Sequence, residues 1–149
     1  MKFYLSEVMD LIRSRRTIKP EKYSPRKVQR DQIEKMLEAA NWAPTHGRTE
    51  PWRFKVYAGE ALTELLHAWA VIFKELTPPE KFLQEKYDNI ISRAQKCSAA
   101  ILVWMKRQES GAIPEIEEYA ACACAKRLCS NCVLVPLLWV ACHCLRAAS

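Results

Sequence analysis

Two segments of the sequence carry side chains suited to an anionic ligand. The first is Arg15-Arg16-Thr17, and the second runs from Asn41 to Trp52 and contains Trp42 and His46. Each segment falls where an amphipathic helix is expected to end, so cationic and amide donors from two helix ends can converge on one anion. Guanidinium groups bind phosphate oxygens bidentately, which favours a phosphorylated ligand.

Each of these residues also has a simpler structural role open to it. An arginine pair at a helix C-terminus is usually a solvated cap that complements the helix dipole. A single loop histidine such as His46 more often makes a hydrogen bond to the backbone. Trp52, Trp69 and Trp104 fall at strand and helix positions that favour core packing over stacking on a ligand. The combination of motifs therefore carries the prediction of a site.

The composition predicts one globular domain, and its positive charge fits an anionic ligand, a nucleic acid or an acidic surface about equally well. The chain has 149 residues, of which 50% are hydrophobic and 27% charged, and its net charge is +6. Basic residues are scattered among acidic ones rather than gathered in a stripe, so nucleic-acid binding is not expected. With three glycines and no Walker or dinucleotide fingerprint, phosphate binding would depend on side chains.

No membrane segment or secretory signal is expected from the sequence. Residues 1–16 include Glu7 and Asp10 and lack an uninterrupted hydrophobic run. The longest apolar stretch, residues 133–141, contains Pro136 and is too short to span a bilayer. These features predict a cytoplasmic protein.

The hydrophobic pattern predicts the elements that position these side chains. Helical spacing of apolar residues indicates a first helix ending at Arg16 and a second that follows an Asp31/Glu34 capping box. A third helix is expected after Gly59, with an apolar face from Leu62 to Phe73. A fourth runs to about Lys96, and a fifth begins at about residue 113. Strands are expected around residues 53–57 and 99–105. The fold class is therefore α+β, a sheet flanked by helices. Two strands alone are marginal in water, so a partner chain or further residues should complete the core.

The motifs together resemble those of FMN-dependent nitroreductases of the small, single-domain, homodimeric branch. The resemblance runs from Glu7 to about Ala125, and it implies a nitroreductase-like central sheet that is incomplete at the C-terminus. The residues that carry it are Asp10-Leu11-Ile12, Arg15-Arg16-Thr17, residues 37–46, Glu50-Pro51-Trp52-Arg53-Phe54, residues 113–118, Ala121 and Ala123.

The resemblance implies a flavoenzyme that uses NAD(P)H as electron donor. It assigns FMN contacts to Arg15, Arg16, Thr17, Trp42 and His46. It also implies a homodimer and a ping-pong reaction, in which the nicotinamide reduces the flavin and a small acceptor such as a nitroaromatic or a quinone then takes the electrons. The cofactor performs this chemistry, so no side chain is assigned as a general acid or base.

The cysteines concentrate at the end of the chain. Six lie after Ala121: Cys122, Cys124, Cys129, Cys132, Cys142 and Cys144. The Cys129/Cys132 pair has CxxC spacing with His143 nearby, but the other spacings match no common zinc finger. Disulfides are not expected in a reducing cytoplasm, and the strand-to-helix setting of a redox CxxC is absent. No metal site is predicted here or at Glu115, Glu117 and Glu118, which form a charge cluster at a helix start.

Residues 1–125 therefore read as a partial nitroreductase-like domain and residues 126–149 as an atypical, non-native tail. We considered the reading frame that begins at the third base of each codon. If Ser130 is encoded by AGC or AGT, the codons for Leu128 to Cys132 can encode Leu/Met/Val-Gln-Gln-Leu in this frame, and the Trp139/Val140 junction must encode glycine. Both features resemble the family's own continuation. Our hypothesis is a frameshift near Ala125 or Lys126 that leaves an impaired enzyme. The alternative is a non-catalytic remnant that neither retains flavin nor dimerises.

Overall fold

The computed structural model describes residues 4–16, 18–131 and 137–141. The chain forms two compact units. The first, called here the helical unit, comprises residues 1–19, 30–52 and 105–134; the second, the sheet unit, comprises residues 20–29, 53–104 and 135–149.

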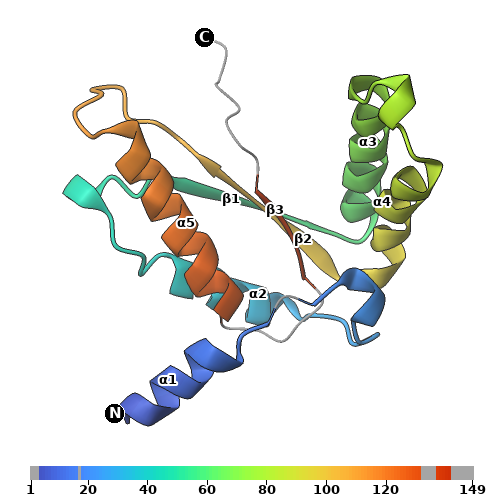
Figure 1. The fold of residues 1–149 in the computed structure, drawn as a ribbon. Coiled ribbons are helices and arrows are strands. Elements are labelled where there is room, and N and C mark those ends of the chain that lie inside the picture. Colours follow the sequence, from blue (N-terminus) through green and yellow to red (C-terminus); the bar gives the residue numbers. More distant parts are fainter. Residues whose placement is uncertain (1–3, 17, 132–136, 142–149) are drawn as a thin grey trace. The chain divides into compact units, whose positions relative to one another are not determined.

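The helical unit is built on the packing of α2 (Arg30–Ala40) against α5 (Glu115–Asn131), seen in Figure 1. The buried residues of α2 are Ile33, Met36 and Ala40, which belong to the apolar stripe predicted from the sequence. Residues four apart on α5 are also buried, namely Ala121, Ala125 and Cys129. Small side chains at this spacing form one face of a helix and allow a close approach between helix backbones.

Helix α1 (Leu5–Ser14) of the same unit has no buried residue. The predicted apolar face is present, but its residues are exposed, from 37% for Met9 to 77% for Leu5. The backbone N–H of Tyr4 donates to the Glu7 carboxylate at 3.2 Å, which closes the N-terminal turn of the helix. The apolar stripe of α1 is therefore open to solvent in the single chain.

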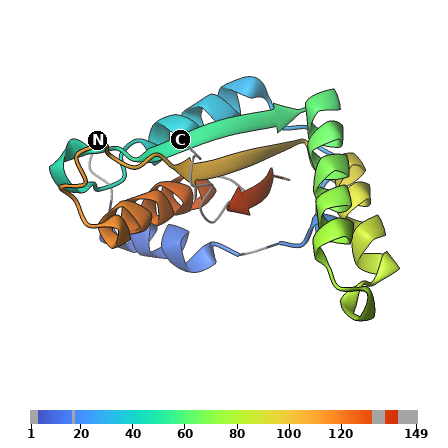
Figure 2. The same ribbon diagram turned by 90° about the horizontal axis from the view of Figure 1, so that it is seen from above.

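The sheet unit contains three strands and two long helices. Its strands are β1 (Trp52–Ala58), β2 (Ala99–Met105) and β3 (Leu137–Ala141), in the order β1-β2-β3 (Figure 2). Strands β2 and β3 are parallel, and their register runs from Ala99 opposite Leu137 to Val103 opposite Ala141. The other elements are η1 (Pro20–Lys22), α3 (Glu60–Leu76), η3 (Pro79–Lys81) and α4 (Gln84–Lys96).

The core of the sheet unit forms where α3 packs on α4. Leu62, Leu66 and Ala70 of α3 form one buried cluster with Ile90, Cys97 and Ala100. Strand β2 occupies the middle of the sheet, and its residues Ala99, Ala100, Ile101 and Val103 are buried. A continuously apolar strand is typical of this position, which confirms the prediction for residues 99–105.

The mixed helix-and-sheet class is confirmed, whereas the number of strands differs from the prediction. The pattern predicts two strands, and the structure adds β3 within residues 126–149. The apolar run 133–141 contains Pro136 and lacks the alternation of a half-buried strand, so periodicity does not reveal it. None of the helices in the described ranges is long and apolar enough to cross a membrane.

Candidate functional site

The loop between α2 and β1 carries Trp42 and His46, and a hydrogen bond joins its two ends. Trp52 Nε1 donates to Asn41 Oδ1 at 3.0 Å, and the Trp52 side chain is buried. Trp52 is thus the core residue that the sequence predicts, while Trp69 and Trp104 are half-buried. Trp42, by contrast, is 81% exposed. Its indole is therefore free of the core and open to a ligand.

Within this loop, three residues have a left-handed backbone conformation. Gly47, Arg48 and Glu50 have φ angles of 60°, 54° and 39°, the left-handed region that residues other than glycine rarely enter. The hydroxyls of Thr45 and Thr49 lie 2.9 Å apart, and the Glu50 N–H donates to Thr45 Oγ1 at 3.3 Å. The loop is therefore held in its conformation by its own polar side chains at some cost in backbone strain.

This loop also contacts the start of α5. A Cβ placed on Gly47 would lie 3.4 Å from Ile113 Cδ1, an ordinary van der Waals distance, so the loop approaches Ile113 here. His46 Nδ1 lies 2.5 Å from Glu117 Oε2, and the two side chains are 62% and 44% exposed. Because a carboxylate oxygen accepts hydrogen bonds, this contact suits a histidine that carries a proton on Nδ1.

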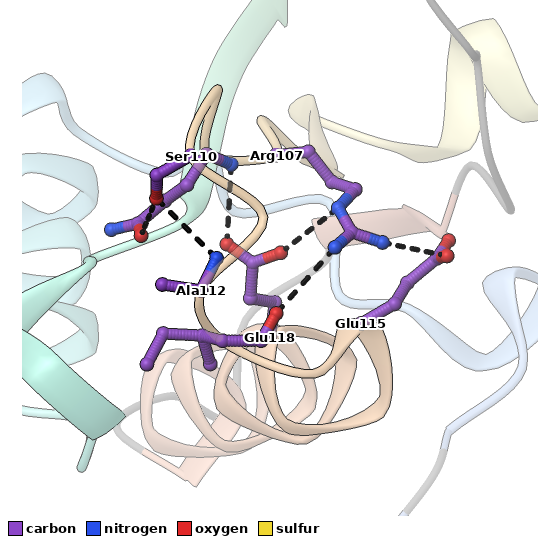
Figure 3. Close-up of polar contacts among 7 residues, drawn as sticks. Arg107, Ser110, Ala112, Glu115 and Glu118 are labelled. Atoms are coloured by element: carbon purple, nitrogen blue, oxygen red, sulfur yellow. Dashed lines mark hydrogen bonds and ion pairs between the residues drawn. The ribbon is translucent and has the colours of Figure 1, made fainter.

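The start of α5 is itself fixed by an arginine in the loop that follows β2 (Figure 3). Arg107 Nη1 donates to Glu115 Oε2 at 2.8 Å, and Arg107 Nε lies 3.4 Å from Glu118 Oε2. The Glu118 side chain is 1% exposed, and its Oε1 accepts from the Gln108 N–H at 3.4 Å. A buried carboxylate needs such a partner, because removing its charge from water is costly.

The three glutamates lie in the first turn of α5, as the sequence predicts for a charge cluster at a helix start. Their partners were not apparent from the sequence. Arg107 comes from the β2–α5 loop and His46 from a loop 71 residues before Glu117. Among the residues that the structure describes, no group of three or more His, Cys, Asp or Glu side chains could hold a metal ion.

The arginine segment lies at the end of α1. Arg16 Nη1 donates to the backbone carbonyls of Arg13 and Arg15, the latter at 3.0 Å. Arg16 therefore takes the simpler role of a helix cap in the structure. Arg15 is the C-cap residue and is half-buried. Thr17 falls outside the described residues.

The structure brings some of the predicted site residues together and not others. Trp42 and His46 share one loop, and His46 is paired with Glu117, a residue that the sequence reasoning did not assign to the site. Arg15 and Arg16 belong to the same helical unit but lie at the C-terminal end of α1. In the described ranges, the polar contacts of Arg16 and of His46 are made to other residues, not to each other.

A second group of ionisable side chains lies in the sheet unit. Burial raises the pKa of Cys97 above its ordinary value of 9.0, although the nearby Arg93 guanidinium partly offsets the shift. Burial likewise raises the pKa of Tyr23, and Cys97 adds to that effect. Both groups are therefore held in their neutral forms, which suits structural rather than nucleophilic roles.

Comparison with known proteins identifies relatives of this sequence. Residues 12–132 match the Nitroreductase family. A protein of Bacillus subtilis (strain 168), named "Putative NAD(P)H nitroreductase YfhC", is 34% identical over 106 residues, which cover 70% of this chain and 53% of that protein. The chain thus spans about half the length of this curated relative.

Solved structures share the fold. A nitroreductase-like family protein from Bacillus cereus superposes with a TM-score of 0.68 at 27% identity, covering 89% of this chain and 66% of that one. The FMN-dependent nitroreductase NfnB from Mycobacterium smegmatis, solved in complex with NADPH, has a TM-score of 0.61 at 15% identity, covering 87% and 71% of the two chains. At this lower identity the similarity shows the fold alone.

Proposed function

This chain belongs to the nitroreductase family, and on that basis we propose that it is an FMN-dependent oxidoreductase. Its electron donor is NAD(P)H, and its acceptor is a small molecule such as a nitroaromatic or a quinone. The observation that carries the proposal is the family match over residues 12–132, which spans the Arg15-Arg16-Thr17 segment and the Trp42/His46 loop. The chemistry that bound FMN supplies is two-electron transfer from donor to acceptor in ping-pong order.

The side chains present suit the parts of this cofactor. A guanidinium has five N–H donors, so Arg16 can contact phosphate while Nη1 remains on its own helix. Arg15 and the Thr17 hydroxyl supply further donors of the kind that phosphate oxygens accept. The exposed indole of Trp42 can stack on an aromatic ring system, and His46 offers Nε2. These residues bind and orient the cofactor, and none is proposed as a general acid or base.

We further propose that the protein works as a homodimer in the cytoplasm. The α1 residues Leu5, Val8, Met9 and Ile12 follow the i, i+3, i+4, i+7 spacing of one helix face, and all are exposed. Contiguous exposed apolar surface of this kind favours association with another protein surface. A second copy of the chain is the partner that the family resemblance implies.

The second candidate is a non-catalytic remnant that does not retain flavin. It rests on residues 126–149, whose sequence departs from the pattern of the family. The two candidates differ in a property that is simple to measure.

The deciding experiment is reconstitution of the purified 149-residue chain with FMN. The proposal predicts a yellow protein that keeps flavin absorbance after gel filtration and oxidises NADH or NADPH in the presence of a nitroaromatic acceptor. Heat-denatured protein with the same amount of free FMN is the control. A colourless product with oxidation no faster than that control would support the remnant instead.

A further inference from the structure

We infer that Glu117 is a positioning residue for His46, which fixes the proton on Nδ1 and thereby leaves Nε2 to face the ligand. The part of this inference that names FMN as the ligand rests on the proposed function. Its structural basis is the contact of 2.5 Å between His46 Nδ1 and Glu117 Oε2. The tautomer of a histidine is set by the hydrogen bond that one ring nitrogen makes, so this contact determines what the other nitrogen offers.

Both partners of this contact are held by neighbouring interactions. On the histidine side, the Asn41–Trp52 hydrogen bond joins the loop ends, and Gly47 packs against Ile113. On the glutamate side, Glu117 lies between two residues that Arg107 contacts, since Glu115 and Glu118 both pair with that guanidinium. The carboxylate is therefore presented from a fixed turn of α5 to a ring on a fixed loop.

The same first turn of α5 explains why Glu117, and not a neighbour, takes this role. Glu115 and Glu118 are engaged with Arg107, and Glu118 is buried. Only Glu117 is seen in contact with the imidazole in the described part of the chain. Replacing Glu115 therefore removes an equal charge from the same turn without removing the partner of His46, which makes it a matched control.

The contact is poorly suited to stabilising the fold. Its side chains are 62% and 44% exposed, and exposed ion pairs contribute about 0–1 kcal/mol. A purely structural role would therefore leave little trace when Glu117 is replaced. A positioning role predicts a different outcome, in which thermal stability is nearly unchanged while the state of the His46 ring changes.

The first test is nitrogen-15 NMR of the histidine rings in the protein without FMN, at an alkaline pH where imidazole is neutral. His46→Gln assigns the His46 signals among the three histidines of the chain. We expect the Nδ1–H tautomer in the wild type, in Glu115→Ala and in Glu117→Gln, whose amide oxygen still accepts a hydrogen bond. Glu117→Ala should shift His46 toward Nε2–H. The same tautomer in Glu117→Ala and in the wild type would overturn the inference.

The second test is FMN affinity, measured by quenching of flavin fluorescence. Glu117→Ala should weaken binding about tenfold, the equivalent of ~1.4 kcal/mol or one hydrogen bond, while Glu117→Gln and Glu115→Ala remain close to the wild type. Equal affinity in all four proteins would overturn the role of Glu117 toward the ligand. If the wild type itself binds no FMN, the proposed function fails, and the tautomer measurement alone decides whether Glu117 positions His46.

Discussion

Trp52 Nε1 donates a hydrogen bond of 3.0 Å to Asn41 Oδ1, across the loop that carries Trp42 and His46. Asn41 immediately follows α2, and Trp52 is the first residue of β1. Because the indole is buried, its N–H depends on this acceptor rather than on water. The contact therefore fixes both ends of the loop.

Replacing Asn41 by leucine should destabilise the protein. The indole N–H of Trp52 would lose the acceptor seen here, at a cost of about 1–2 kcal/mol in the free energy of unfolding. Asn41→Asp keeps an oxygen at the same place and serves as the control. Urea denaturation followed by tryptophan fluorescence measures both variants. Equal stability of Asn41→Leu and the wild type would show that the hydrogen bond does not hold the loop.

Replacing Arg107 by methionine should be more damaging. The Glu118 carboxylate, which is 1% exposed, would remain buried without its cation. Breaking a buried pair on one side costs about 3–5 kcal/mol, and the 40% exposure of Arg107 places the expected loss near the lower end of that range.

The matched variant removes both charges. Arg107→Met combined with Glu118→Leu leaves no buried carboxylate, so it should recover much of the lost stability. Melting temperatures by circular dichroism give the comparison. A double variant as unstable as Arg107→Met would mean that Arg107 acts through packing of its side chain and not through Glu118.

Cys97 should react slowly with iodoacetamide at mildly alkaline pH. The thiol is buried and its pKa is raised, so both access and the thiolate fraction are reduced. Cys124, which is exposed, provides the comparison within the same molecule. Peptide mass spectrometry should show that the alkylation rate of Cys97 is at most about one tenth of that of Cys124. Comparable rates would contradict the placement of Cys97 in the core.

The same shift predicts how stability changes with pH. Because the folded thiol has the higher pKa, the unfolded chain releases the Cys97 proton first as pH rises. The stability that this group contributes is fully present below its ordinary pKa of 9.0 and is lost as pH rises through the folded value. In Cys97→Ala, the decrease in the free energy of unfolding that Cys97 causes at alkaline pH should be absent. Urea denaturation curves recorded at several pH values measure it.

The apolar face of α1 should mediate self-association. Ile12→Glu places a charge on that face, where Ile12 is 55% exposed in the single chain. We expect it to convert a dimer to a monomer in light scattering coupled to gel filtration, because burying an unpaired charge at an interface is costly. Ser6→Glu adds the same charge to the same helix outside the apolar stripe and should remain dimeric. A wild-type monomer across the accessible concentration range would contradict the homodimer.

The elements of the fold could largely be predicted from local sequence patterns. Ile33, Met36 and Ala40 are buried along α2 as their spacing indicates, and the apolar run of β2 is the middle strand. Strand β3 could not be predicted, because its pairing with β2 joins residues far apart in sequence and its own pattern is that of a short apolar run.

The candidate site was predictable only in part. The motifs locate Trp42 and His46 on one loop, but the partner of His46 depends on how that loop meets α5, which spacing does not encode. The same holds for Arg107, whose partners depend on the path of the β2–α5 loop. The division at residue 125 and the frameshift stay predictions, which the coding DNA decides.

Whether this chain binds FMN through its arginine segment is decided by titrating the purified protein with FMN and measuring the dissociation constant of the wild type, Arg16→Met and Arg13→Met. Arg13 lies on α1, before the Arg15-Arg16-Thr17 segment, and is the matched control. We expect saturable binding that Arg16→Met weakens about tenfold, as for the loss of one phosphate contact, and that Arg13→Met leaves nearly unchanged. Absence of saturable binding in the wild type, or equal binding by all three proteins, would contradict this expectation.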